Sequence, residues 1–191
     1  MKKYDTKHIR NLALVGHSGS GKTSLGEALL FQTKAISRLG RVDDGNTVSD
    51  FDKEEIARGI SIDLSILPVE WKDFKINLLD APGYFDFEGQ VLSSLRAAEA
   101  AIMVIDASAG IEVGSELYWN YMEKISLPRI IFLSKMDKPN VDFNVRVSEL
   151  HQQFGQKVIP LTLTLGMGED FEGLIDVMDK KAYKYDGFKA T

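Results

Sequence analysis

The chain has 191 residues, of which 44% are hydrophobic, and this is enough for about one domain with its own core. It contains no cysteine, which excludes a disulfide scaffold and any cysteine-based metal site, and its net charge of −5 argues against general nucleic-acid affinity. We expect no signal peptide and no membrane-spanning segment, because no apolar run approaches the ~20 residues that a span needs. The simplest interpretation is a soluble, cytoplasmic protein, which we expect to be a monomer.

The first predicted elements are a buried strand and a helix, joined by a glycine-rich loop. The apolar run at residues 9–15 predicts the strand, and the spacing of Leu25, Ala28 and Leu29 predicts the helix. Between them, residues 16–23 read Gly-His-Ser-Gly-Ser-Gly-Lys-Thr, which fits the phosphate-loop pattern G-x-x-x-x-G-K-[ST] at every fixed position. Strand, loop and helix together form the context in which this pattern binds phosphate.

The residue types of the loop indicate how it binds a nucleotide. Glycines let successive backbone N–H groups point inward and form a nest for phosphate oxygens at a helix N-terminus. Lys22 supplies a positive charge for the outer phosphates, and the Thr23 hydroxyl is a Mg²⁺ ligand. The alternative, a glycine-rich turn that binds nothing, is disfavoured by the flanking elements. The expected nucleotide contacts in this stretch are Gly16, His17, Ser18, Gly19, Ser20, Gly21, Lys22, Thr23 and Ser24.

A long polar connection follows the first helix, from residue 32 to residue 59. Such a length is uncommon in a compact domain and indicates a functional loop. Residues 43–46 predict a turn, and residues 51–55 predict charged surface. Because this segment has little apolar surface to bury, we expect residues 38–58 to be mobile without a bound nucleotide.

Two strands follow, at residues 62–71 and 74–79, and the short turn between them predicts an antiparallel hairpin with Pro68 on an edge strand. The second strand runs into the sequence Asp-Ala-Pro-Gly. The Asp80 carboxylate, at the C-terminal end of a strand, is placed to hold Mg²⁺ directly or through water. Gly83 can bring its backbone N–H close to a terminal phosphate. The pattern D-x-x-G often marks only a turn, but its position after an apolar strand favours the functional interpretation.

The rest of the chain alternates between helices and strands, which predicts an α/β fold of three layers with a largely parallel sheet and an antiparallel edge hairpin. One helix begins near residue 88, with Val91, Leu92, Leu95 and Ala98 on one face, and Asp142 could cap another. The further expected elements are strands at 101–105, 129–133, 158–165, 174–177 and 182–185, helices at 115–125 and 143–154, and a turn at 166–169.

The sequence Ser134-Lys135-Met136-Asp137 follows the strand at residues 129–133, at the sheet edge where open α/β sheets bind ligands. A carboxylate at Asp137 accepts two hydrogen bonds from N1–H and the N2 amino group of guanine, whereas adenine would leave it unpaired. The stem of Lys135 would lie along the ring or ribose. The alternative is a solvated turn, which the position on the sheet disfavours.

These motifs resemble those of the GTP-binding domain of elongation factor G, and more closely those of the paralogous elongation-factor-G-like proteins. Residues 16–23, 58–62, 80–83 and 134–137 match, in order, four of the family's five GTPase motifs. The resemblance implies a P-loop GTPase fold, a GTP/GDP and Mg²⁺ site, and GTP hydrolysis stimulated by the ribosome. The further nucleotide contacts it implies are Asp80, Ala81, Pro82, Gly83, Tyr84, Ser134, Lys135, Met136 and Asp137, and the implied Mg²⁺ ligands are Thr23, Ser61 and Asp80.

The resemblance also implies a domain organisation. Residues 32–60 correspond to switch I of the family, and switch II begins at Tyr84. Residues 1–155 correspond to a GTP-binding domain that lacks its last strand and helix, and residues 156–191 to the beginning of a subdomain inserted in it. Since the fifth motif, a Ser-Ala pair, is not found, we expect the chain to be a fragment.

Several positions differ from the family's pattern. Ser134 stands where the family has an asparagine that braces the phosphate loop, and Ser61 replaces the switch I threonine but keeps its hydroxyl. Ser18 and Gly19 replace a hydrophobic residue of the gate beside the attacking water and an aspartate. His17 is shared with the family, and we interpret it as a structural residue of the loop rather than a catalytic one.

Tyr84 is the difference with the largest consequence, because the family places there the histidine that orients the attacking water. Our first hypothesis is a GTPase in which Lys22, Gly83 and Tyr84 act in catalysis, with slow hydrolysis because of the tyrosine. The second is a GTP-dependent ribosome-binding module with little or no hydrolysis. A ribosomal protection protein of the tetracycline-resistance kind is a third, and a P-loop kinase or ATPase is disfavoured by Lys135 and Asp137.

Overall fold

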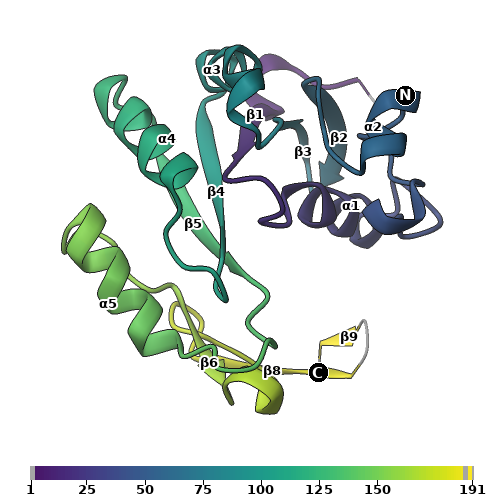
Figure 1. The fold of residues 1–191 in the computed structure, drawn as a ribbon. Coiled ribbons are helices and arrows are strands. Elements are labelled where there is room, and N and C mark those ends of the chain that lie inside the picture. Colours follow the sequence, from purple (N-terminus) through teal and green to yellow (C-terminus); the bar gives the residue numbers. More distant parts are fainter. Residues whose placement is uncertain (1–2, 187–188, 191) are drawn as a thin grey trace. The chain divides into compact units, whose positions relative to one another are not determined.

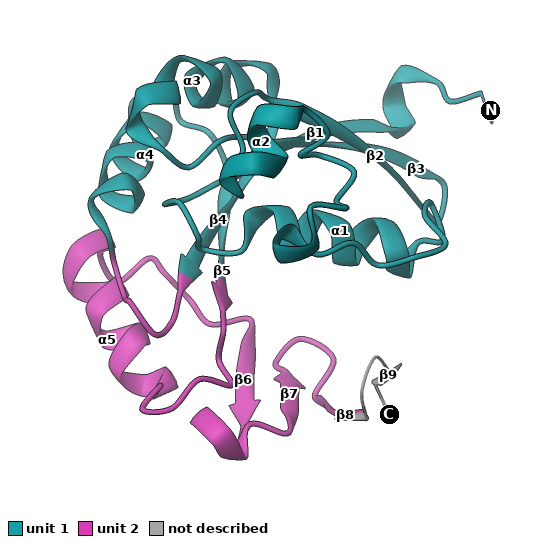
Figure 2. Ribbon diagram, turned by 45° about the vertical axis from the view of Figure 1, so that its right-hand side comes forward, with its two compact units in different colours: residues 1–105, 112–132 teal, residues 106–111, 133–191 magenta. Residues whose placement is uncertain are grey.

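The computed structural model describes residues 3–186 and 189–190 of the chain. Two compact units divide it: residues 1–105 with 112–132 form the first, and residues 106–111 with 133–191 form the second (Figure 2). The division runs through two strands and differs from the boundary predicted at residue 155, which follows the family's architecture and stays a prediction. Among the described residues, no helix combines the length and the apolar character needed to cross a membrane.

The main sheet has five strands in the order β2-β3-β1-β4-β5. Their bounds are β1 Ile9–Val15, β2 Ser65–Trp71, β3 Phe74–Asp80, β4 Ala100–Asp106 and β5 Arg129–Ser134. Strand β1 pairs in parallel with both β3 and β4, and β2 pairs antiparallel with β3 at the edge of the sheet. The structure thus confirms the predicted mostly parallel sheet with an antiparallel edge hairpin, and it places Pro68 on the edge strand.

Helices cover both faces of this sheet in the first unit, with α1 (Lys22–Gln32) on one face and α3 (Glu88–Ala97) on the other (Figure 1). The helix α4 (Val113–Lys124) also belongs to this unit. The core under α1 is a cluster of aliphatic side chains from the helix and three strands: Leu14, Leu30, Leu67, Val69 and Leu78. Val91 and Leu95 of α3 are buried, as the predicted apolar face of that helix requires.

The long polar connection contains a helix that the sequence analysis missed, α2 (Lys53–Arg58). Its first turn is closed by a capping box, in which the Asp52 carboxylate accepts from Glu54 N–H and the Glu55 carboxylate accepts from Asp52 N–H. Gly59 ends it with a left-handed backbone, φ 63°. The charged residues predicted as surface therefore form a capped helix, and one of them, Glu55, is buried.

The second unit contains α5 (Phe143–Phe154) and a small antiparallel sheet in the order β6-β7-β8-β9. Its strands are β6 Thr162–Leu165, β7 Gly173–Asp176, β8 Lys181–Asp186 and β9 Lys189–Ala190. Asp142 caps α5 as predicted, accepting from the N–H groups of Asn144 and Val145. Strand β6 begins later than predicted, because Val158 is held in a turn by Gly155 and His151 and Pro160 has no N–H to donate.

Short 3₁₀ helices complete the described chain, at Thr6–His8, Val42–Asp44, Phe85–Phe87 and Gly168–Asp170.

The core of the second unit is built from Ala107, Met136 and Val141, with Leu133, Phe143 and Phe171 packed against it. Met136 lies between the two other predicted guanine-site residues, Lys135 and Asp137. The loop that carries those residues is therefore anchored by a buried side chain.

Candidate functional site

The predicted phosphate loop joins β1 to α1 in the first unit, and its glycines are required by its geometry. A Cβ on Gly16 would lie 2.2 Å from the backbone oxygen of Val104 in the neighbouring strand β4. Gly19 and Gly21 have left-handed backbones, with φ of 74° and 96°, and Gly21 is the N-cap of α1. The loop thus turns tightly against β4 and brings the N-terminus of α1, whose first two residues are buried, to the site.

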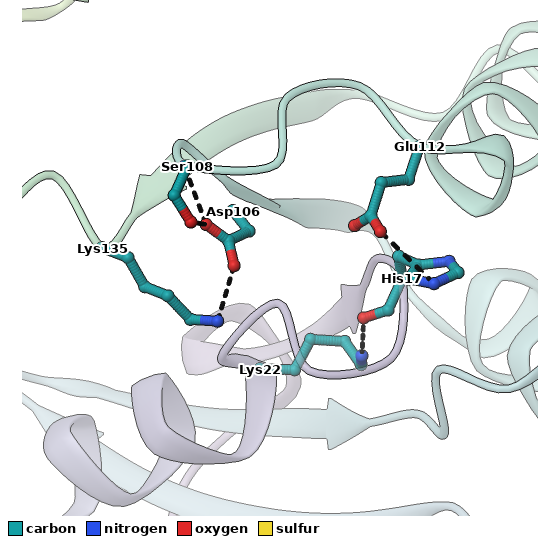
Figure 3. A network of polar contacts seen from close by, with 6 residues as sticks. All are labelled: His17, Lys22, Asp106, Ser108, Glu112 and Lys135. Carbon is teal, nitrogen blue, oxygen red and sulfur yellow. Dashed lines mark hydrogen bonds and ion pairs between the residues drawn. The ribbon is translucent and has the colours of Figure 1, made fainter. Parts of the chain in front are cut away.

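Lys22 lies under this loop and is almost completely buried. Its ammonium donates to the backbone oxygens of Gly16 at 3.0 Å and His17 at 2.8 Å, the latter drawn in Figure 3. Burial lowers the pKa of Lys22 to about 8, although the Asp80, Asp50 and Glu112 carboxylates act in the opposite direction. An anionic phosphate beside this ammonium would therefore stabilise its charged form, which is the electrostatic complement that a phosphate site needs.

A cluster of hydroxyl and carboxylate groups lies where the sequence predicts a Mg²⁺ site. The Thr23 hydroxyl donates to Asp80 Oδ2 at 2.9 Å and is 3.3 Å from the hydroxyl of Ser61. The other oxygen of the buried Asp80 carboxylate has no hydrogen-bond partner among the described residues. Burial raises the pKa of Asp80 to about 6, against the opposing effects of Lys22 and of the Thr23 hydroxyl.

These groups fit a magnesium ion. Mg²⁺ prefers carboxylate and hydroxyl oxygens, and it takes its remaining ligands from water and substrate phosphates. Among the residues that the structure describes, no three histidine, cysteine or carboxylate side chains form a metal-binding group. An ion held by Thr23, Ser61 and Asp80 would take its remaining ligands from water or from the phosphates of a bound nucleotide.

The residues after Asp80 pack against the phosphate loop. Ala81 is buried and donates its N–H to the backbone oxygen of Leu14 at 3.2 Å. Gly83 comes so close that a Cβ there would meet the Lys22 ammonium nitrogen at 2.6 Å and the Ser18 nitrogen at 2.7 Å. Tyr84 follows with 42% of its surface exposed.

His17 has partners that the sequence did not indicate. Its Nε2 is 3.4 Å from a carboxylate oxygen of Glu112, just before α4 (Figure 3). Its ring stands edge-on to Phe85, with 6.1 Å between the ring centroids. A Cβ on Gly114 would come within 3.2 Å of its Nδ1. His17 thus packs the phosphate loop against the start of α4 and against the 3₁₀ helix at Phe85–Phe87. These contacts support its interpretation as a structural residue.

The predicted guanine motif lies in the second unit, where Lys135 has a left-handed backbone with φ of 55°. Its ammonium lies 2.6 Å from Asp106 Oδ2, and the other oxygen of that carboxylate accepts from the N–H and hydroxyl of Ser108 at 2.8 and 2.6 Å (Figure 3). Burial acts against the charged form of Asp106, but hydrogen bonds from Lys135 and Ser108 outweigh it and hold its pKa below the ordinary value. Asp137 is exposed.

The residues predicted for the nucleotide site therefore fall into two groups, one in each unit. Lys22, Thr23, Ser61, Asp80 and Gly83 lie together in the first unit, and the motif at residues 134–137 lies in the second. The sequence analysis missed the charged partners around them: Glu27, Asp50, Asp106 and Glu112. Only Asp106 carries a signal in the sequence, since it ends a continuously apolar strand and, like Asp80, is the last residue of its strand.

The strand order, the glycine loop between β1 and α1 and the carboxylate at the end of β3 define an α/β domain of the P-loop GTPase type. Within this class, the chain belongs to the family of elongation factor Tu GTP-binding domains, whose model matches residues 7–188. The resemblance inferred from the motifs is thereby confirmed.

Individual relatives agree. The chain is 39% identical over 185 residues to elongation factor G of Mycoplasma genitalium, covering 97% of this chain and 27% of that protein. It is 36% identical over 184 residues to the elongation factor G-like protein of Thermotoga maritima, covering 96% and 26%. A crystal structure of a Thermus thermophilus protein superposes with a TM-score of 0.91 at 39% identity, covering 96% of this chain and 28% of that one. The chain spans about a quarter of the length of these relatives.

Proposed function

We propose that the chain is a GTP-binding and GTP-hydrolysing domain of an elongation-factor-G-like translation factor that acts on the ribosome in the cytoplasm. The observation that carries the proposal is the buried corner in which Lys22, Thr23 and Asp80 meet the phosphate loop. The buried ammonium of Lys22, the carboxylate oxygen of Asp80 that has no hydrogen-bond partner among the described residues, and the hydroxyl of Thr23 are groups that a Mg²⁺-nucleotide site needs. In this proposal, residues 156–191 belong to the subdomain inserted in the family's GTP-binding domain.

The chain's own groups have separate roles in binding and hydrolysis. Backbone N–H groups of the phosphate loop and the Lys22 ammonium bind phosphate oxygens and stabilise the charge that develops on the transferred group. Thr23, Ser61 and Asp80 hold Mg²⁺, which when bound neutralises charge on the outer phosphates. Gly83, with no side chain in the way, presents its N–H to the terminal phosphate while water attacks in line.

Guanine selectivity is proposed to depend on Asp137, with Lys135 along the base or ribose. A competition titration against a fluorescent GDP analogue tests this assignment. GTP should compete and ATP should not, and Asp137→Asn should weaken GTP binding and shift preference toward xanthosine nucleotides, whose 2-oxo group suits an amide donor. If ATP competes as well as GTP against the wild-type protein, the proposed base assignment is wrong.

Tyr84 favours a second candidate function, a GTP-dependent ribosome-binding module with little hydrolysis. A neutral imidazole can accept a proton from water, whereas a neutral phenol is a poor acceptor, and a positioned proton-handling group contributes about 10²–10⁴-fold in rate. We therefore expect the intact factor to bind GTP normally but to hydrolyse it on ribosomes at least ~10-fold slower than a histidine-bearing elongation factor G does.

Single-turnover hydrolysis with ribosomes decides between the two functions. Wild type, Tyr84→His and Tyr84→Phe should be compared at saturating GTP, so that differences in affinity do not enter the rate. A faster Tyr84→His variant supports the slow-hydrolysis interpretation. If wild type already matches the histidine-bearing factor and Tyr84→Phe loses the activity, the phenol is a competent substitute and the second candidate is refuted.

A further inference from the structure

A single buried carboxylate holds both ends of the loop at residues 40–48. Glu27 lies on α1, one helical turn after Thr23, and is 1% exposed. Its Oε2 accepts from Gly40 N–H at 3.0 Å and its Oε1 accepts from Val48 N–H at 2.5 Å. One side chain therefore fastens the beginning and the end of this loop to the helix that carries Lys22 and Thr23.

The loop is closed tightly over this carboxylate. A Cβ on Gly40 would lie 2.5 Å from Glu27 Oε2, 2.7 Å from the backbone oxygen of Asn46 and 2.9 Å from the Cα of Thr47. The Asn46 side chain accepts from Arg41 N–H at 2.7 Å, which ties the two arms of the loop together. Gly40 itself does not have a left-handed backbone, so its lack of a side chain serves the close approach to Glu27.

The same segment leads directly to the candidate metal site. Two residues after Val48, the buried Asp50 accepts from the Ser61 hydroxyl at 2.7 Å, and that hydroxyl is 3.3 Å from Thr23 Oγ1. The helix α1 thus contacts switch I at two levels, through Thr23 at the metal site and through Glu27 one turn further on. Side chains four residues apart lie on the same helix face, so both contacts fall on one side of α1.

We propose that Glu27 is a positioning residue that fixes residues 40–48 on α1 and, through Asp50, places Ser61 for the Mg²⁺-GTP state. A buried carboxylate is stable only when its hydrogen bonds are made, so Glu27 favours the closed loop over an open one. The inference rests on the proposed function, since Ser61 matters only if a Mg²⁺-nucleotide binds. The inference predicts a difference between the two nucleotides. The closed loop should strengthen the binding of GTP, which reaches switch I, more than the binding of GDP.

The test compares affinities for GDP and a non-hydrolysable GTP analogue, with Mg²⁺, by calorimetry. Glu27→Gln keeps the shape but turns an amide NH₂ toward one of the two N–H donors, so one hydrogen bond is lost. Gly40→Ala leaves the carboxylate intact and instead crowds the loop away from it. Glu54→Gln is the matched control, because Glu54 is exposed and pairs with Arg58 on the surface of α2.

We expect Glu27→Gln and Gly40→Ala to weaken the GTP analogue about 10-fold, which corresponds to about 1.4 kcal/mol, and GDP by less than about 3-fold. Amide hydrogen exchange should quicken at residues 40–48 in both variants, and Glu54→Gln should change neither quantity. An equal loss for the two nucleotides, or no loss, would overturn the positioning role. If wild type binds neither guanine nucleotide, the proposed function fails instead. In that case, unchanged amide exchange at Gly40 and Val48 in Glu27→Gln would overturn the inference that Glu27 fixes residues 40–48 on α1.

Discussion

Replacing Gly83 with alanine should damage the phosphate site by steric crowding alone. Gly83 does not have a left-handed backbone, so alanine can adopt its conformation without strain. The new Cβ would lie 2.6 Å from the Lys22 ammonium nitrogen and 2.7 Å from both the nitrogen and the Cα of Ser18. Ordinary contacts of a Cβ begin near 3.4 Å, so the Ser18 backbone must retreat by 3.4 − 2.7 = 0.7 Å.

The magnitude follows from which atoms can move. The Lys22 ammonium can swing aside, but only by giving up hydrogen bonds to the backbone oxygens of Gly16 and His17. The Ser18 backbone belongs to the loop that is proposed to bind the phosphates through its N–H groups, so a retreat would misalign them. Overpacking of this kind typically costs about 1–3 kcal/mol, which corresponds to about 5- to 150-fold in Kd for GTP.

Calorimetry with a non-hydrolysable GTP analogue measures the effect, and Gly89→Ala provides a matched control. A Cβ on Gly89 meets no atom within 4 Å, and the residue lies in α3. Gly89→Ala should leave the affinity unchanged and should stabilise the helix by about 0.5–1 kcal/mol, seen as a higher Tm. If Gly83→Ala binds the analogue within about 2-fold of wild type, the loop relaxes without cost and the steric argument is refuted.

Three further predictions concern groups outside the phosphate loop. Asp106→Asn should raise the Kd for GDP about 2- to 5-fold, a modest effect because Lys135 is partly exposed, and it should have no effect in a Lys135→Met background. Ser134→Asn in the intact factor should tighten GDP binding about 2- to 12-fold in calorimetry, and no change would show that another group already makes the contact. Asp52→Ala should remove the cap of α2 and cost about 1 kcal/mol of stability in thermal unfolding, whereas an unchanged Tm would show that the helix does not need it.

The fold could be predicted because the amino-acid composition of its strands indicates how deeply each strand is buried. Strand β4 is mostly buried and reads as a continuous apolar run up to Asp106, and β1 is buried over its apolar second half, which is typical of parallel strands covered on both faces. The hairpin of β2 and β3 was equally readable from its short turn. Hydrophobic periodicity could not predict α2, because a helix of six residues has too few turns to show an apolar face. The local signals were the spacing of Asp52 and Glu55, which is that of a capping box, and Gly59 at the end of the helix.

The phosphate and guanine motifs were readable because each is a short stretch whose chemistry is local. Their charged partners were not, because ion pairs join residues that are far apart in the sequence. Asp106 and Lys135 are 29 positions apart, and they meet because β4 and β5 end at the same edge of the sheet. Glu112 contacts His17 for a comparable reason, since α4 begins beside the phosphate loop. A pattern search along the chain cannot see such pairs.

The polar composition of residues 38–58 was interpreted as a sign of mobility, which stays a prediction, but the structure shows a second way to order such a segment. Glu27 and Glu55 are buried. The Glu27 carboxylate accepts hydrogen bonds from backbone N–H groups within the segment, and the Glu55 carboxylate accepts from backbone N–H groups just after it. Apolar burial is therefore not the only source of order here, because a buried carboxylate loses much stability when its donors leave. An order that depends on hydrogen bonds is directional and is lost when one bond is misaligned, which suits a segment that must distinguish two nucleotide states.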